Sequence, residues 1–374
     1  MRKNLLILLI KFKILCHKCN LRCCYCYNSK ERAEVEEKSL PFEIARAGID
    51  EYFTNNPSRH IRFYGPGEPT MEFDLMRQIV EYAKGKDRNV TVEIQTNGTF
   101  STKMREWILD NLNIVWISFD GTPDIQDRQR QLGDKLKKSS LIIEGNVKWL
   151  NANKGNRNLM VGARVTMTDL NVNRQIEMVD YFNNLGIKYI WTDPIFPEVK
   201  KHPVCEDKNR GNLYQIDLEV YVKNFIEAHR YAKTRDVFYG SFLTCNFDGE
   251  TKVHCRACTP VPHLTPDGYV SACDLVVYGE KTYHMDCFIY GKWDEQNKKF
   301  IYFGNKIKAL QNRNIDNITH CKDCIARLHC GGYCIAEVQN ETGRLDGQKP
   351  ETCKAIRTLY KELGPCEAYH YAHP

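Results

Sequence analysis

The segment CNLRCCYC, residues 19–26, is the most informative stretch of this chain. Cys19, Cys23 and Cys26 follow the spacing Cys-x3-Cys-x2-Cys, which places three thiolates around one cubane iron-sulfur cluster. One iron is then left without a protein ligand, so it can chelate a small molecule and pass it an electron. Zinc is the alternative, but a structural zinc site closes with four ligands, usually from Cys-x2-Cys pairs.

The spacing resembles the motif of the radical S-adenosylmethionine (SAM) superfamily, in which an aromatic residue usually precedes the last cysteine. Tyr25 occupies that position here. The resemblance implies a [4Fe-4S] cluster that binds SAM at its open iron and cleaves it reductively. The product is a 5'-deoxyadenosyl radical, which removes a hydrogen atom from the substrate.

Composition limits the function classes. The chain has 374 residues, 42% of them hydrophobic, which suffices for one large barrel or two domains. Its net charge of +6 is spread along the sequence without a nucleic-acid-binding motif, so we expect no nucleic-acid partner. Lys11 and Lys13 interrupt the apolar N-terminal run, which therefore predicts a buried strand and not a signal peptide.

No run of about 18 apolar residues occurs, so no membrane span is predicted. The 17 cysteines are odd in number and grouped at short spacings. Such grouping favours metal ligation in a reducing cytoplasm over disulfides, and oxygen-sensitive clusters point to an anaerobic setting.

Strand and helix patterns alternate from residue 41 to about residue 235. After the N-terminal strand, strands are predicted at 59–65, 89–98, 113–121, 158–167 and 187–194, and helices at 41–53, 71–85, 104–112, 141–153 and 174–186. These six β/α units predict a parallel sheet with helices outside. They are too few for an eight-stranded barrel, and the resemblance implies a partial (β/α)6 TIM-like barrel.

The helical stretch 216–234 is expected to bridge to a second region, in which cysteine, glycine and aromatic residues show little regular periodicity. The predicted domains are therefore a barrel over 1–235 and a small domain organised by metal over 236–374.

Polar residues lie where the predicted strands end, the edge at which sites of such sheets gather. The segment FYGPGEP (63–69) resembles the superfamily's Gly-Gly-Glu-Pro loop, which binds the methionyl amine of SAM, but Pro66 is inserted between Gly65 and Gly67. The glycines allow close backbone approach, and Glu68 supplies an acceptor for an ammonium group. A plain Gly-Pro-Gly turn is the alternative.

The next three strands end in QTNG (95–98), SFDG (118–121) and GARVT (162–166). By position, the resemblance implies that Ser118 reaches the ribose of SAM and Arg164 its carboxylate, with Gln95, Asn97 and Asp120 nearby. Taken singly, each could be a solvated cap at a strand end.

The C-terminal cysteines follow the order Cys258-x9-Gly268-x4-Cys273, Cys321-x2-Cys324-x5-Cys330-x3-Cys334, then Cys353. This order resembles the SPASM extension of some radical SAM enzymes and implies two auxiliary [4Fe-4S] clusters. The resemblance gives Cys258, Cys273 and Cys334 to the first, with Cys255 as fourth ligand, and Cys321, Cys324, Cys330 and Cys353 to the second. Cys245 could replace Cys255 as the fourth ligand of the first cluster, or the fourth iron of that cluster could be open to substrate. For residues 321–334, a zinc knuckle is the alternative.

Asp274 follows Cys273 directly, as an aspartate does in anaerobic sulfatase maturases, where it is proposed to take a proton during substrate oxidation. A surface aspartate is the alternative interpretation. The resemblance implies a radical SAM maturase that oxidises or crosslinks a side chain of a ribosomally made precursor peptide, reduced by a donor such as flavodoxin or ferredoxin. An anaerobic sulfatase maturase that makes formylglycine, and a non-catalytic iron-sulfur electron carrier, are the other hypotheses.

Overall fold

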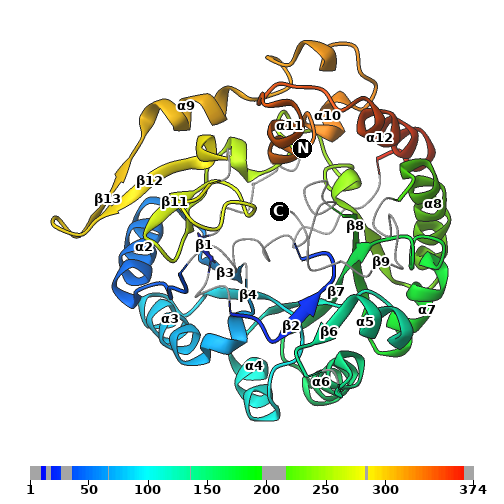
Figure 1. Ribbon diagram of the computed structural model, residues 1–374, viewed down its shortest axis with the longest axis horizontal. Coiled ribbons are helices and arrows are strands. Elements are labelled where there is room, and N and C mark those ends of the chain that lie inside the picture. The colour runs from blue at the N-terminus through cyan, green and yellow to red at the C-terminus, as the bar shows by residue number, and fades with distance from the viewer. Residues whose placement is uncertain are drawn as a thin grey trace.

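The computed structural model describes residues 10–13, 18–26, 36–65, 67–134, 136–195, 216–282 and 285–365. Its centre is a curved sheet of parallel strands that follow one another in chain order (Figure 1). The strands are β1 (Ile10–Lys13), β3 (His60–Tyr64), β4 (Thr91–Thr96), β5 (Ile114–Ser118), β7 (Met160–Met167), β8 (Tyr189–Pro194) and β9 (Phe238–Gly240). Because they are parallel, their carboxyl ends meet at one rim. The expected parallel sheet is confirmed, and β9 extends it beyond the predicted units.

Helices cover the outer face of this sheet, in the positions that the sequence periodicity predicts (Figure 1). They are α2 (Phe42–Asn55), α3 (Phe73–Lys86), α4 (Arg105–Asn111), α6 (Ser139–Asn153), α7 (Gln175–Asn184) and α8 (Leu218–Thr234). In α8, the Asp217 side chain caps the first turn by accepting a hydrogen bond from Glu219 N at 2.7 Å. Tyr221, Phe225 and Ala228 recur on one face and are fully buried, which fixes the helix on the sheet.

The alternation of side chains along each strand decides what fills the barrel. In β3, Ile61 and Phe63 belong to the apolar core under the helices, whereas Arg62 points the other way. In β7, Val165 belongs to the same core and Arg164 faces the interior. The outer face is thus apolar and the barrel interior carries charges, which leaves room for a polar site.

The sheet does not stop at the barrel. Next to β1 lie β10 (His263–Leu264), β11 (Tyr269–Ser271), β12 (Ile289–Asp294) and β13 (Lys299–Tyr302), making an 11-stranded sheet. β10 pairs in parallel with β1, and the other three pair antiparallel. The sequence shows little regular periodicity after residue 240, and these short strands gain their order from pairing across the chain. The boundary at 235/236 falls between α8 and β9, and the sheet continues across it.

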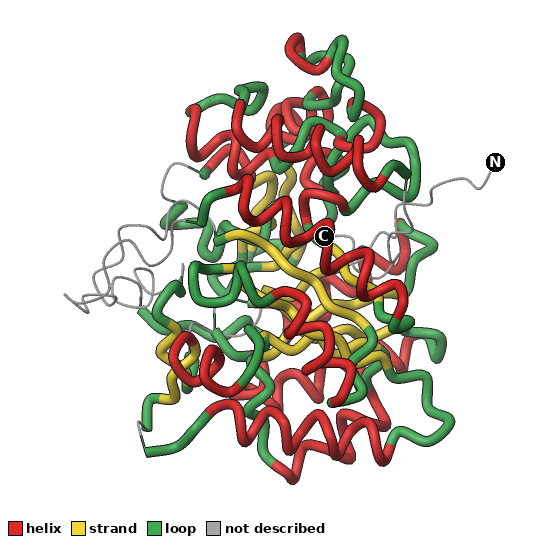
Figure 2. The backbone as a smooth tube through the Cα atoms, turned by 90° about the vertical axis from the view of Figure 1, so that its right-hand side faces the viewer, coloured by secondary structure: helices red, strands yellow, loops and turns green. Residues whose placement is uncertain are grey.

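The described part of the cysteine-rich C-terminal region continues with the helices α9 (Gly304–Asn312), α10 (Arg327–Cys330), α11 (Ile335–Thr342) and α12 (Pro350–Leu363). α12 packs against α8, so the C-terminal region is attached to the barrel wall (Figure 1). Viewed from the side, the strands lie in the interior with helices above and below them (Figure 2).

A separate pair of short strands lies at the rim. β2 (Leu21–Cys23) pairs antiparallel with β6 (Arg130–Leu132), which follows α5 (Pro123–Gln129). None of these three elements was predicted from the sequence: β2 and β6 have three residues each, too few to show a period, and α5 runs directly into β6. The pair anchors the three-cysteine loop to the barrel.

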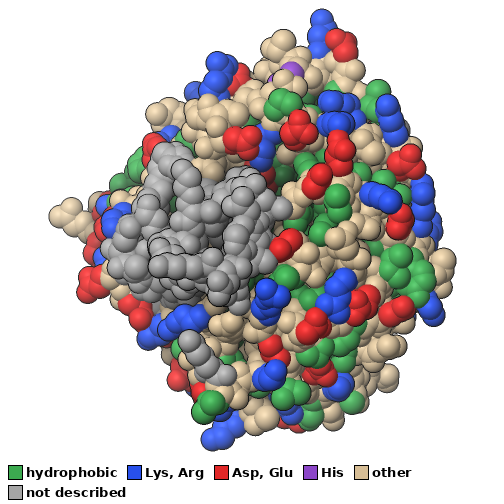
Figure 3. Space-filling model, turned by 45° about the vertical axis from the view of Figure 1, so that its right-hand side comes forward, with side chains coloured by type: hydrophobic (Ala, Val, Ile, Leu, Met, Phe, Trp, Pro, Cys, Tyr) green, Lys and Arg blue, Asp and Glu red, His purple; other side chains and the backbone are tan. Residues whose placement is uncertain are grey.

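The surface carries mixed charges. On the face seen in Figure 3, Lys and Arg side chains alternate with Asp and Glu side chains over the described part of the chain. None of the described helices is both long enough and apolar enough to cross a membrane.

Candidate functional site

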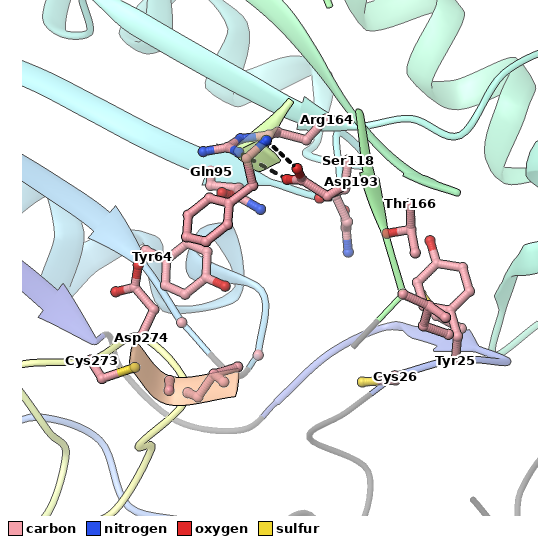
Figure 4. Close-up of a pocket in the computed structure, with 18 of the residues that line it drawn as sticks. Tyr25, Cys26, Tyr64, Gln95, Ser118, Arg164, Thr166, Asp193, Cys273 and Asp274 are labelled. Atoms are coloured by element: carbon pink, nitrogen blue, oxygen red, sulfur yellow. Dashed lines mark hydrogen bonds and ion pairs between the residues drawn. The ribbon is translucent and has the colours of Figure 1, made fainter. Parts of the chain in front are cut away.

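A cavity of about 290 Å³ lies at the rim where the parallel strands end (Figure 4). It is lined by predicted site residues from three parts of the sequence: Cys19, Cys23, Tyr25, Cys26, Gly65, Gly67, Glu68, Gln95, Asn97, Ser118, Arg164, Cys255, Cys273, Asp274 and Cys334. The predicted residues that do not line it are Asp120, Cys258, Cys321, Cys324, Cys330 and Cys353. Pro66 lies outside the described residues. Segments far apart in the sequence therefore converge on one chamber.

The three-cysteine loop is held by the β2–β6 pair. Cys23 lies opposite Arg130 in the register, and Cys24 N donates to Gln129 O at 2.9 Å. Burial raises the pKa of the Cys23 thiol, and Arg130, whose Nη1 lies 3.9 Å from Cys23 Sγ, opposes that rise. A guanidinium beside these thiols favours the thiolate form that iron binds.

Asp120 lies behind the cavity wall, with its side chain fully buried. The sequence predicts that it approaches SAM. In the structure its carboxylate accepts hydrogen bonds from the Tyr25 hydroxyl, from Arg130 Nε at 2.9 Å and from Thr166 N at 3.0 Å. Arg130 also stacks over the Tyr25 ring, 5.1 Å from Cζ to the centroid. Asp120 therefore fixes the residues behind the cysteine loop and does not itself reach the cavity.

Glu68 is buried and almost saturated by donors from the chain. Its Oε1 accepts from the hydroxyls of Thr70 at 2.7 Å and Thr96 at 2.6 Å, and its Oε2 accepts from Asn97 N at 2.6 Å. Burial raises the pKa of this carboxyl, whereas these donors stabilise its ionised form. One lone-pair direction of Oε2 remains for an ammonium group.

Asn97 connects the end of β4 to the cysteine loop. Its Nδ2 donates to Asn20 Oδ1 at 2.8 Å and lies 3.8 Å from Cys19 Sγ. Its Oδ1 accepts from Thr99 N at 2.9 Å, which orients the amide. A donor directed at a cysteine sulfur is the kind of contact that tunes an iron-sulfur cluster.

Arg164 stands at the floor of the cavity between two indole rings. Its Cζ lies 5.3 Å from the Trp116 ring centroid and 5.1 Å from that of Trp191. Its Nη1 is 3.7 Å from Asp193 Oδ2 (Figure 4). Burial lowers the pKa of Arg164 and raises that of Asp193, and the two opposite charges counter both shifts. Rings and carboxylate together fix the direction of the guanidinium.

A second charged network fills the barrel beneath the cavity. Arg62 Nε lies 3.1 Å from Glu93 Oε1, with both side chains 2% exposed. Glu93 Oε2 also lies 3.0 Å from His60 Nε2, and Arg62 Nη2 donates to Gln95 Oε1 at 3.2 Å. Sequence reasoning missed Arg62, Glu93 and His60, although their alternation with apolar residues in β3 and β4 was available as a signal.

The cysteines predicted for the first auxiliary cluster come together. Cys255, Cys273 and Cys334 line the cavity, and the charges that act on the Cys334 thiol include those of the other two. Cys258 is 1% exposed and accepts a hydrogen bond from Arg313. Burial raises the pKa of the Cys258 thiol to about 12, so this thiol ionises at neutral pH only with a metal in place of its proton.

The cysteines predicted for the second auxiliary cluster form another group. The charges of Cys353 and Cys324 act on the Cys321 thiol, and the charges of Cys321, Cys353 and Cys324 act on the Cys330 thiol. No three cysteine, histidine or carboxylate side chains among the described residues are grouped to hold a single metal ion. The four thiols predicted for the second auxiliary cluster thus lie within electrostatic reach of one another.

Cys245, the other candidate for the first auxiliary cluster, lies close enough to Cys255 and Cys330 for their charges to act on its thiol. It is buried in an apolar group with Trp116 and Trp191, and its Sγ is 3.8 Å from His254 Nε2. Unlike Cys255, it does not line the cavity. Cys258 does not line the cavity either, so Cys245 and Cys255 both stay predictions for the fourth ligand.

Asp274 faces the cavity beside Cys273 (Figure 4) and is held by a partner that the sequence did not reveal. His263 Nδ1 lies 3.3 Å from Asp274 Oδ1, and the histidine side chain is 3% exposed. Ser271, which lies opposite His263 in the β10–β11 register, accepts from Cys273 N at 3.1 Å and donates to Cys273 O at 3.0 Å. The turn that carries Asp274 is thus fixed by contacts from both β10 and β11. A surface aspartate would have no such contacts.

Comparison with known families gives this geometry a context. Residues 14–193 match the model of the radical SAM superfamily, a span that includes the three-cysteine loop and the strand ends from β3 to β8. The chain carries a radical SAM domain. This domain implies a [4Fe-4S] cluster and SAM as cofactors. The site fits both cofactors: Cys19, Cys23 and Cys26 supply three thiols, Arg130 lies beside Cys23, and the cavity adjoins them.

Curated relatives extend beyond the radical SAM domain. The chain is 25% identical over 333 residues to the cysteine-type anaerobic sulfatase-maturating enzyme of Clostridium novyi, covering 84% of each protein. It is 24% identical over 376 residues to the radical SAM cyclopropyl synthase TigE of Paramaledivibacter caminithermalis, covering 94% of this chain and 72% of TigE.

Solved structures share the fold. The structure of anSMEcpe with bound AdoMet has a TM-score of 0.72 at 16% identity, covering 96% of this chain and 93% of that one. Streptococcus suis SuiB bound to S-adenosylmethionine has a TM-score of 0.62 at 14% identity, covering 93% and 77%. The likeness includes the cysteine-rich region as well as the radical SAM domain.

Proposed function

We propose that this chain is a radical SAM maturase that oxidises or crosslinks a side chain of a ribosomally made peptide. The observation that carries the proposal is that one cavity is lined by Cys19, Cys23 and Cys26 and also by Cys273 and Asp274. A side chain inserted there would face both the SAM-binding motif and a carboxylate that can take a proton. Two similar solved structures hold peptides, anSMEcpe with the Cp18Cys peptide and SuiB with its precursor peptide SuiA, which supports this substrate class.

Bound at the open iron of the cluster held by Cys19, Cys23 and Cys26, SAM would supply the 5'-deoxyadenosyl radical that removes a hydrogen atom from the substrate. Tyr25, held by Asp120, closes the wall behind this loop. The fixed position of these groups is what allows the substrate carbon to be held in line and water to be excluded.

The strand-end residues suit the polar parts of SAM. Glu68 offers the remaining lone pair of Oε2 to the methionyl amine, next to the close backbone approach that Gly65 and Gly67 allow. Arg164, oriented by its two indole neighbours, pairs with the methionyl carboxylate. Ser118 reaches the ribose; Gln95 and Asn97 line the cavity nearby.

Asp274 takes a proton from the substrate after hydrogen-atom removal, and the clusters held by the C-terminal cysteines would accept the electron released with it. We predict that Asp274→Asn leaves SAM cleavage to 5'-deoxyadenosine intact and slows formation of the modified peptide at least about tenfold. Asp286→Asn is the matched control, because that side chain is 73% exposed. Unchanged product formation in Asp274→Asn would remove Asp274 from the reaction.

A specific observation supports a second candidate. The C. novyi relative is named a sulfatase-maturating enzyme and matches over 84% of both proteins, so oxidation of a sulfatase cysteine or serine to formylglycine is the alternative reaction. Incubation with a sulfatase-derived peptide, and with any short cysteine-rich peptide encoded beside this gene, followed by mass spectrometry, separates the two. Formylglycine supports the second candidate, and a crosslink or other oxidised side chain supports the first.

The non-catalytic carrier is tested first. Anaerobically reconstituted protein, reduced chemically or by a cytoplasmic flavodoxin or ferredoxin, should release 5'-deoxyadenosine from SAM. A protein that holds its iron but releases none would be an electron carrier. A protein that binds only zinc would contradict both maturase candidates.

A further inference from the structure

Arg313 is a buried cation without a carboxylate partner in the part of the chain that the structure describes. It follows α9 at its C-terminal end and is 4% exposed. Its partners are three backbone carbonyls and one thiol. Burying a charge is unfavourable unless an opposite charge compensates it, so the position calls for anionic groups nearby.

Two of the carbonyls come from the loop between Cys330 and Cys334, and the third comes from Leu345, between α11 and α12. Arg313 Nη1 donates to Gly331 O at 3.2 Å, Nη2 to Gly332 O at 2.5 Å, and Nε to Leu345 O at 3.1 Å. Both glycines have positive φ, +64° and +89°, which other residues rarely adopt. A Cβ on Gly332 would lie 2.8 Å from Arg313 Nη1. Gly332 thus allows the guanidinium its close approach, whereas a Cβ on Gly331 would meet the backbone of Val253.

This loop joins the two groups of cysteines. It runs from Cys330, assigned to the second auxiliary cluster, to Cys334, assigned to the first. Arg313 also donates to Cys258 of the first group, and its charge acts on Cys321 of the second. One guanidinium therefore reaches both sets of sulfurs.

We propose that Arg313 is the shared counter-cation of the two auxiliary clusters and raises the reduction potential of both. The inference rests on the proposed function, which supplies the two clusters. Four cysteinates around a [4Fe-4S] core carry net negative charge, which compensates the buried guanidinium. Reduction adds one more negative charge, so a fixed cation that donates to Cys258 and whose charge acts on Cys321 favours the reduced form of both clusters.

The test is a redox titration, monitored by electron paramagnetic resonance, of the anaerobic full-length protein. Arg313→Gln removes the positive charge, and Arg313→Lys retains it without the planar guanidinium. Arg344→Gln is the control, because Arg344 is 71% exposed and pairs with Asp346. In Arg313→Gln we expect both auxiliary potentials to fall by at least about 59 mV, a tenfold change in a one-electron equilibrium. Arg313→Lys should recover at least half of that shift. The SAM-binding cluster and Arg344→Gln should stay unchanged.

Other outcomes decide between distinct failures. Unchanged potentials in Arg313→Gln with full iron content would overturn the proposal. Loss of auxiliary iron from Arg313→Gln but not from Arg313→Lys would support the proposal. Equal loss of iron from Arg313→Lys would overturn it, because it would show that the planar guanidinium is required and not the positive charge. Absence of auxiliary iron from the unaltered protein would overturn the proposed clusters themselves.

Discussion

His263 touches Asp274 from the neighbouring strand and fixes where that carboxylate points in the cavity. We predict that His263→Phe, which fills the space but removes the polar contact to Asp274, slows product formation about tenfold, since losing a contact to a charged group costs roughly 1.5 kcal/mol. His263→Asn should recover much of the rate. The measurement is the ratio of modified peptide to 5'-deoxyadenosine, with kcat and KM determined separately. Equal rates for the Phe and Asn variants would show that the polar contact has no positioning role.

At the residue scale, spacing along the chain identified side chains that the structure brings to one cavity. The cysteine spacings and the strand-end polar residues could be predicted because ligands and loop residues lie close together in the sequence. His263 and Arg130 could not, because each meets its partner through strand pairing that no local pattern reveals. Asp120 was correctly placed at a strand end, but its donors occupy it and turn it away from the cavity.

Among the elements, β7 has two different faces. Its outer face packs into the apolar core, and its inner face carries Arg164. Gly162 makes this possible, because a Cβ there would lie 2.4 Å from Trp116 Cζ3, and Trp116 supports Arg164. We predict that Gly162→Ala costs about 1–3 kcal/mol of unfolding free energy through overpacking and weakens SAM binding. Denaturant unfolding and SAM titration measure the two effects.

The matched control for that element is Gly85 in α3, whose added Cβ would meet nothing within 4 Å. Gly85→Ala should be neutral or stabilise the protein by up to about 1 kcal/mol, because alanine is the better helix former. A Gly162→Ala variant as stable as Gly85→Ala, with unchanged SAM affinity, would show that the Trp116 ring moves freely and does not support Arg164.

Elements were predictable in proportion to the length of their pattern. α8 spans 17 residues with a capped start and an apolar face, so its period is evident from sequence. β10 has two residues and α10 four, and their order comes from pairing with β1 and from the cysteine loops around them. Periodicity cannot report structure that distant contacts impose.

For the whole molecule, the two regions differ in what holds them together. The barrel has an extensive apolar core between strands and helices, including Ile61, Phe63 and Phe182, each fully buried. Around the C-terminal cysteines, buried thiols and Arg313 interrupt an apolar core that continues from the barrel through residues such as Leu310, Val338 and Leu359. The cysteine-rich region should therefore depend on metal for its stability, because metal binding and folding are coupled in such sites.

We predict that anaerobic removal of iron by a chelator exposes residues 245–363 to hydrogen exchange and leaves β3, β4 and β5 protected. A variant with Cys321, Cys324 and Cys353 changed to Ala should reproduce the effect near those residues, since it removes the ligands of the second auxiliary cluster. Changing Cys19, Cys23 and Cys26 to Ala is the control and should leave 245–363 protected, because those thiols serve the other cluster. Hydrogen-exchange mass spectrometry measures each case. Uniform loss of protection across barrel and C-terminal region would instead mean that the 11-stranded sheet unfolds as one unit, with the metal stabilising the whole of it.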